Sequence, residues 1–221
     1  MTFQRARNDE QREARRRAIL ETATAMLDEM GVAELTLNEL SRRVGRAKSN
    51  VLRYFDSREA VLLELLDAAV QEWLTEVSDA LVRGVDPRRP VTERADRLSE
   101  VLASTLAARR PLCELLGAQG GVLEHNVSVE VVVKHKRVAL ARLTSAADLL
   151  RRHVPELGGE AERVCFHVLV LAGALAPYSS PPAGVQAAYD LEPALAVLHL
   201  ELRDSLRSAI RMLLTGAVPR A

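Results

Sequence analysis

Apolar side chains recur every three or four residues along most of the chain, which is the spacing of an α-helix with one buried face. Between residues 160 and 176 this spacing selects Ala161, Val164, Cys165, Val168, Leu171, Ala172 and Leu175. Clusters of Pro and Gly interrupt the pattern, most clearly over residues 84–90 and 177–189. The chain is therefore predicted to be all-α, with helices separated by short breaks.

The pattern predicts about nine helices, over residues 12–30, 36–44, 47–53, 56–82, 91–108, 111–116, 123–153, 160–176 and 192–214. Residues 1–9 are polar and charged without a period, so we expect them to be disordered. Asp56 and Glu59 are expected to cap the fourth helix as a capping box. Glycines at 117, 120 and 121 are expected to form a flexible joint.

The segment Val127–Val133 is ambiguous by itself, because its valines alternate with other residues as in a β-strand. Its continuation from Val138 to Leu150 has helical spacing throughout. One long helix accounts for both halves, and we therefore interpret the segment as helical.

The stretch Thr36–Arg58 predicts two short helices joined by a tight turn. Thr36 and Glu39 have the spacing of a capping box, and Gly45 follows the first helix, where a residue free to adopt positive φ is needed. This layout is a helix-turn-helix, whose second helix lies in the major groove of DNA. The local charge agrees, since residues 42–53 include Arg42, Arg43, Arg46, Lys48 and Arg53 and no Asp or Glu.

The run Gly45–Glu59, GRAKSNVLRYFDSRE, resembles the DNA-binding signature of the tetracycline-repressor (TetR) family, above all in Tyr54-Phe55 followed by Ser57-Arg58-Glu59. The resemblance implies a three-helix DNA-binding domain over residues 1–56. It implies a helical effector-binding and dimerisation domain over residues 57–221. It also implies a repressor that binds a palindromic DNA operator as a homodimer and that a small-molecule effector releases.

Eight residues are candidates for DNA contact: Thr36, Arg46, Lys48, Ser49, Asn50, Arg53, Tyr54 and Arg58. Lys48, Ser49, Asn50 and Arg53 face outward early in the second helix, where Arg and Lys suit guanine and Asn suits adenine. By the resemblance, Thr36, Tyr54 and Arg58 match positions that bind phosphates. Arg46 departs from the family's usual small or apolar residue, and both base and phosphate remain open as its contact. The arginines at 12 and 15–17 form either a solvated helix end or a further phosphate contact.

The last two predicted helices are the expected dimer surface, because the small residues Ala172, Gly173, Ala174 and Ala176 allow close helix approach. The alternative is that these stripes pack against their own chain. By the resemblance, the middle helices enclose the effector. The expected lining residues are polar or aromatic groups within aliphatic helices: Trp73, Cys113, Asn126, Glu130, Phe166, His167 and Tyr178. Each of them is also compatible with an ordinary core position.

Composition limits the remaining functions. Over the 221 residues, 30 basic and 30 acidic side chains cancel, so only the local basic patch argues for nucleic acid. Two distant cysteines and unpaired histidines give no metal-site spacing, and no enzyme or cofactor motif is present. The sequence shows no leader peptide and no apolar run long enough to span a membrane, so a cytoplasmic protein is expected. An architectural DNA-binding protein without an effector is the competing function, disfavoured by the long helical segment after the motif.

Overall fold

The computed structural model describes the backbone of residues 2–218 and the side chains of residues 10–218. Within these residues all regular structure is helical, as predicted, and the elements comprise ten α-helices and three short helical turns. The helices are α1 (Thr2–Glu29), α2 (Leu37–Val44), α3 (Lys48–Val51), α4 (Arg58–Gly84), α5 (Val91–Ala107), α6 (Arg110–Ala118), α7 (Val129–His153), α8 (Ala161–Ser179), α9 (Ala183–Leu191) and α10 (Leu202–Ala217). The turns are the π-helical η1 (Gln119–Leu123) and the 3₁₀ turns η2 (Pro155–Glu160) and η3 (Pro193–Leu198).

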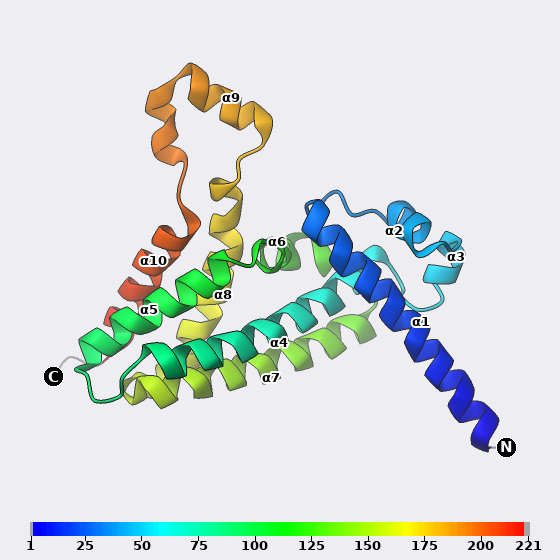
Figure 1. Ribbon diagram of the computed structural model, residues 1–221, viewed down its shortest axis with the longest axis horizontal. Helices are drawn as coiled ribbons and strands as arrows, with labels where there is room; N and C mark the ends of the chain where they lie inside the picture. Colours follow the sequence, from blue (N-terminus) through cyan, green and yellow to red (C-terminus); the bar gives the residue numbers. More distant parts are fainter. Residues whose placement is uncertain (1, 219–221) are drawn as a thin grey trace.

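Helices α1, α2 and α3 form a small unit at one end of the molecule (Figure 1). Its core contains the fully buried Met26, Leu35, Leu40 and Val51. Thr36 caps α2 by accepting a hydrogen bond from the Glu39 backbone N–H at 3.2 Å. Gly45 ends the helix with φ 67°, the left-handed conformation that glycine adopts without a steric penalty. The predicted helix-turn-helix is thus confirmed, with the Thr36 half of the expected capping box; the Glu39 carboxylate instead accepts from Arg42 and Arg43.

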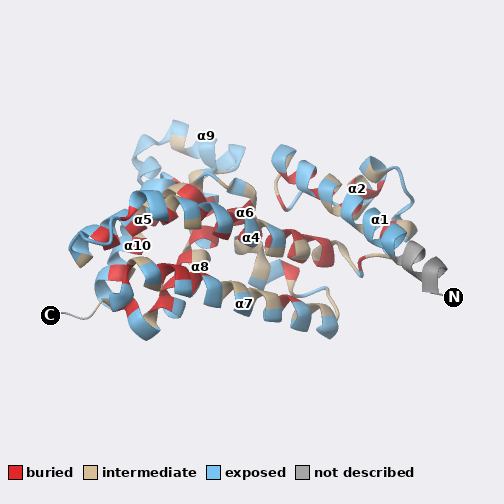
Figure 2. Cartoon of the chain, turned by 60° about the horizontal axis from the view of Figure 1, so that its bottom comes forward, coloured by how far each residue is buried: buried red, intermediate tan, exposed pale blue. Residues whose placement is uncertain are grey.

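The remaining helices form a larger body. Helices α4 and α7 run side by side, and α5 packs against α4 and α10 (Figure 1). Helix α8 contacts α6, α7 and α10, so it lies at the centre of this body. Figure 2 shows the buried residues gathered where these helices face one another. The segment Pro155–Ser179 is long and apolar enough to cross a membrane on composition alone, but its buried side chains are accounted for by these helix contacts.

Both ends of the DNA-binding unit differ from the predicted boundaries. The backbone of α1 is helical from Thr2, so the disorder expected over residues 1–9 is wrong for residues 2–9. Residues 2–9 contain no Pro or Gly and include Gln4, Arg5, Ala6 and Arg7, which favour helices. Helix α4 begins at Arg58 and is capped by Ser57, which accepts from the Ala60 N–H at 3.1 Å. The cap is therefore one residue later than the expected Asp56.

The middle of the chain is more regular than the sequence indicated. Helix α6 continues through Gly117 and passes into the π-helical turn η1, where a flexible joint was expected. Neighbouring helices hold this stretch in place, a tertiary effect that local glycine content does not report. Helix α7 confirms the helical interpretation of the valine-rich segment from Val129 onward, and the Ser128 hydroxyl caps it.

In the C-terminal third of the chain, the structure differs from two predictions. Helix α8 runs through Pro177 to Ser179, and α9 forms inside the expected loop 177–189. The single helix expected over residues 192–214 is instead η3, an extended break at His199, and α10. The helical spacing of Leu195, Leu198 and Leu202 predicted a single helix. These leucines instead lie on two elements that share no buried face.

Candidate DNA-binding surface and effector cavity

Helix α3 is oriented by two buried anchors. Val51 is fully buried and Phe55, just after the helix, is almost so, which turns the opposite face outward. Lys48 and Ser49 are exposed on that face, and Asn50 is half-buried beside them. The side chains early in α3 therefore face solvent, and their contact with bases in the major groove stays a prediction.

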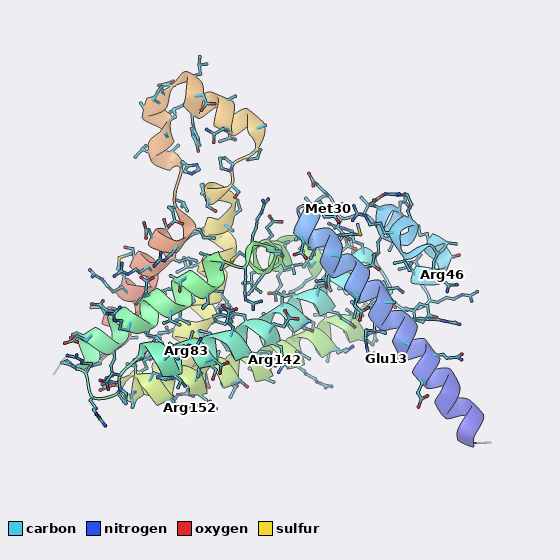
Figure 3. All side chains as sticks on the ribbon, viewed as in Figure 1. Glu13, Met30, Arg46, Arg83, Arg142 and Arg152 are labelled. Atoms are coloured by element: carbon cyan, nitrogen blue, oxygen red, sulfur yellow. The ribbon has the colours of Figure 1, made fainter. Side chains whose placement is uncertain are left out.

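A basic hollow connects α3 to α1. It has a volume of about 270 Å³ and is lined by Arg15, Ala18, Ile19, Val44, Arg46, Asn50, Val51, Arg53 and Tyr54. Arg46 lies at the outer edge of the unit, away from α6 (Figure 3). A second shallow hollow places Arg12 next to Arg15 and Arg53. Two of the N-terminal arginines thus join the candidate DNA-binding residues on one surface.

Arg16 has a different role from its neighbours. Its guanidinium lies 4.7 Å from the centre of the Phe55 ring and forms an ion pair with Glu64 of α4. Glu64 also accepts from Lys134 of α7 at 3.1 Å. One carboxylate therefore ties α1 to α4 and α7.

Arg42 and Arg43 are partly neutralised within α2. Glu39 accepts from the Nε atoms of Arg42 at 2.9 Å and Arg43 at 3.0 Å. These hydrogen bonds, with Arg42 first, lower the pKa of the Glu39 carboxyl from its ordinary value to about 2. The positive charge that Glu39 does not neutralise is therefore carried by Arg46, Lys48 and Arg53. A count of basic residues over positions 42–53 does not show this difference.

Arg58 points inward. Its guanidinium donates to the backbone carbonyls of Val32 and Leu35 in the loop between α1 and α2, and it pairs with Glu59 at 3.1 Å. Thr36 remains exposed beside this loop with its hydroxyl oxygen used in the cap. Arg58 therefore holds the α1–α2 loop in position, and the phosphate contact that the resemblance implied stays a prediction.

A small cavity of about 60 Å³ lies between α4, α7, α8 and the α6–η1 junction. It is lined by Leu66, Asp67, Val70, Trp73, Leu74, Leu116, Gln119, His135, Ala139, Arg142, Leu143, Ala146 and Leu169. The buried Trp73 donates from Nε1 to the Thr105 hydroxyl at 3.0 Å. Ligand pockets usually measure roughly 300–1,000 Å³, so this cavity must expand to admit an effector.

A polar network lies at one side of this cavity. His135 Nδ1 lies 2.8 Å from Asp67 Oδ1, and its Nε2 lies 3.1 Å from the Gln119 amide nitrogen. The same amide donates to Glu124 at 2.9 Å, which in turn pairs with Lys136. A donating amide makes His135 Nε2 an acceptor and places the ring proton on Nδ1, facing Asp67.

Arg142 brings one buried hydrogen-bond donor to the cavity. Its Nε is buried and has no hydrogen-bond acceptor in the described part of the chain. Figure 3 shows Arg142 on α7 where this helix runs beside α4. Sequence reasoning missed Asp67, Gln119, His135 and Arg142, although Asp67 within the apolar run of α4 was an available signal.

The seven predicted effector residues are not brought together. Trp73 lines the small cavity, and Phe166 lines a separate open groove. Cys113 is buried, with Sγ 3.3 Å from the Leu106 carbonyl oxygen. The other four are exposed: Asn126, Glu130, His167 and Tyr178. Burial raises the pKa of the Cys113 thiol to about 11 and that of the Cys165 thiol to about 12, and both cysteines are free.

The small residues of α8 divide between two faces. Ala172, Gly173 and Ala176 are buried within their own chain, as the alternative interpretation of this stripe allowed. The exposed face carries Phe166 and Val170, and it continues through Ala174 and Pro177 along the groove of about 890 Å³.

These features define a helix-turn-helix DNA-binding protein with a helical second domain. Residues 19–65 match the family described as bacterial regulatory proteins, tetR family. Residues 67–221 match the tetracyclin repressor-like C-terminal domain. The chain belongs to the TetR family of transcriptional regulators, as its DNA-binding signature predicted.

Known proteins resemble this chain in sequence over a short stretch and in fold over most of its length. Fifty-five residues are 38% identical to the HTH-type transcriptional regulator EthR of Mycobacterium tuberculosis, a match that spans about a quarter of each chain. A structure described as a possible TetR family transcriptional regulator from Streptomyces coelicolor A3(2) has a TM-score of 0.56 at 21% identity, covering 91% of this chain and 97% of that one. FadR from Bacillus subtilis, solved with stearoyl-CoA, has a TM-score of 0.51 at 12% identity, covering 91% and 98%. Such structural likenesses establish the fold alone.

Proposed function

We propose that this regulator is a cytoplasmic repressor that binds a palindromic operator as a homodimer and is released by a small-molecule effector. The observation that supports it most is the basic surface formed by Arg46, Lys48 and Arg53 together with Arg12 and Arg15 of α1. Arginine and lysine on such a surface neutralise phosphates and read guanine in the major groove. One such helix reads few base pairs, so two copies related by a two-fold axis give the specificity of a palindrome.

The DNA-binding unit is joined to the larger domain at several points besides the chain connection into α4. The Val32 N–H donates to Glu114 of α6 at 2.9 Å, and Ser128 at the start of α7 donates to Asp56 at 3.2 Å. A displacement of α6 or α7 would therefore be passed to the α1–α2 loop and to the segment after α3.

We propose the small cavity beside Trp73 as the effector site in its closed form. Its lining is mainly aliphatic, and Arg142 supplies a buried donor without an acceptor. An apolar molecule with an acceptor group fits both properties, because it satisfies the donor that the closed cavity leaves unpaired. The effector must favour the DNA-free arrangement, and its effect cannot exceed that preference.

Selection from a random-sequence DNA pool tests the proposal against an architectural DNA-binding protein. The repressor is expected to select a palindrome and to give a bounded footprint that a ligand found by thermal-shift screening removes. Lys48→Ala combined with Arg53→Ala is expected to abolish the footprint, while Arg42→Ala serves as a control because Glu39 already holds that guanidinium. Uniform coating of DNA without a selected sequence would support the architectural alternative.

A further inference from the structure

The segment 180–200 leaves the body of the protein as an arm between α8 and α10 (Figure 1). Helix α9 and η3 pack against each other, and the Tyr189 and His199 rings meet edge to face at 6.2 Å. At the base, the Leu200 N–H donates to the Tyr178 carbonyl at 3.4 Å, so the two ends of the arm lie side by side. No residue of α9 or η3 is buried by the described part of the chain, and Figure 2 shows the arm exposed along its length.

The exposed apolar side chains of the arm indicate that another surface packs against it. Leu191 is 88% exposed, Val197 85% and Leu198 61%. A nine-residue helix without a core is only marginally stable in water, and a cluster of exposed large apolar side chains marks an interaction surface. Asp190 and Glu192 are the arm's charged groups apart from His199, and with no Lys or Arg it is repelled by nucleic acid and anionic lipid. The chemistry of the arm therefore fits a protein surface.

The same chain also has an apolar groove that suits the exposed apolar side chains of the arm. The groove measures about 890 Å³ and runs along the exposed face of α8, between α6–η1 and the loop after α1. Phe166 is 55% and Val170 50% exposed on this face, and Leu116, Val122 and Pro177 extend the apolar lining. Its charged groups include Lys136, whose ammonium is accessible, and Glu124, which already pairs with Lys136. The protomer's own arm begins just after Pro177, the last groove residue on α8, and extends outward from the end of that helix (Figure 1).

We propose that the arm of each protomer lies in the α8 groove of a second copy of this chain, so that the two protomers exchange arms. Arm exchange rests on the homodimer proposed above and adds a specific partner surface to it. A two-fold axis makes the contact reciprocal, so one arrangement covers both arms and both grooves. The groove and the arm are continuous along α8, because the helix that carries Phe166 and Val170 leads directly into the arm.

Deletion of the arm tests its contribution to the dimer. Because Tyr178 and Leu200 are hydrogen-bonded across the base, residues 181–199 can be replaced by a two-residue Gly-Ser link. The shortened chain should keep cooperative unfolding and its helical core, since no buried residue is lost, while its dimer dissociation constant rises at least 100-fold in sedimentation equilibrium. A monomeric wild-type protein would overturn the proposed dimer itself. A wild-type dimer that the deletion leaves unchanged would overturn arm exchange alone.

Cross-linking distinguishes exchange from a contact within one chain. Leu191→Cys and Val170→Cys are made in two chains with different tags, which are mixed and treated with a short bismaleimide. Exchange is expected to give a covalent heterodimer, with Val82→Cys, also highly exposed at 71%, as the control partner that gives none. The native thiols are buried, and their raised pKa values limit background reaction. Cross-linking of a chain that carries both substitutions, without any product between chains, would show that the arm folds back onto its own protomer.

Discussion

Gly117 of α6 and Gly173 of α8 touch backbone to backbone. A Cβ atom on Gly173 would lie 2.4 Å from the Gly117 nitrogen, and one on Gly117 would lie 2.8 Å from the Gly173 carbonyl oxygen. Pro177, four residues after Gly173, has no N–H to donate to that carbonyl, which leaves it facing α6. The candidate dimer helix is thus in direct contact with the helix that holds the DNA-binding unit through Glu114.

Gly173→Ala is expected to force α6 and α8 apart. Overpacking of this kind costs roughly 1–3 kcal/mol, which chemical denaturation measures. Because α6 shifts with it, operator affinity should change as well. Gly216→Ala in α10 is the matched control, since no atom of residues 2–218 lies within 4 Å of the added atom, and it should gain about 0.5–1 kcal/mol. Equal stability changes for the two variants would contradict the close contact.

Arg53→Ala tests base recognition. If Arg53 holds a guanine, the loss is about 1–3 kcal/mol and applies to the operator but much less to unrelated DNA. Competition binding at two salt concentrations separates these cases. A loss that is uniform across sequences and flattens the salt dependence would assign Arg53 to phosphate.

Arg58→Ala should act through the position of the α1–α2 loop. Hydrogen bonds from a charged group contribute roughly 1.5–3 kcal/mol each, so the DNA-binding unit should lose stability when the carbonyls of Val32 and Leu35 lose their donor. Hydrogen exchange of this loop measures the loss. The salt dependence of DNA binding should stay unchanged; a flattened salt slope at unchanged stability would instead restore the phosphate contact.

Glu156 makes stability depend on pH. It receives a hydrogen bond from Arg94 at 3.1 Å, and this bond lowers the pKa of Glu156 below its ordinary value. A carboxyl whose pKa falls on folding stabilises the protein above its unfolded pKa, and that contribution disappears as the pH falls through the lowered folded pKa. Glu156→Gln should therefore remove part of the loss of stability in acid, measured by denaturation at pH 7 and below pH 4. An identical acid dependence in both proteins would contradict this.

Ala139→Leu is expected to fill the cavity of about 60 Å³ beside Trp73. The variant should no longer show a ligand-induced change in the fluorescence of this tryptophan, the only one in the sequence. Leu140→Met, on an exposed side of the same helix, is the control that should respond normally. A full response from Ala139→Leu would place the effector elsewhere.

The sequence determined local features well and distant contacts poorly. Thr36 and Gly45 act within their own turns, so their roles were predictable from spacing. The acceptors of Arg58 lie 23 and 26 residues away, which no local pattern reports. Only Trp73 of the predicted effector residues lines the small cavity, because residue type does not tell which face of a helix has a neighbour. The division at residues 56 and 57 stays a prediction; in the structure it falls at the joint between the two parts, just before α4 begins at Arg58.

The shared carboxylate of Glu64 makes that joint responsive to electrolyte. Arg16 and Lys134 reach it from α1 and α7, and Glu64 remains 22% exposed. Mobile ions weaken such accessible pairs, as they weaken contacts with phosphates. Raising the ionic strength would then loosen the attachment of the helix-turn-helix unit to α4 and α7. It would also screen the DNA phosphates from the protein. Titrations of operator binding against potassium chloride accordingly report two processes, the weakening of the Glu64 ion pairs and the weakening of the phosphate contacts. Glu64→Gln removes the first process and would leave only the second.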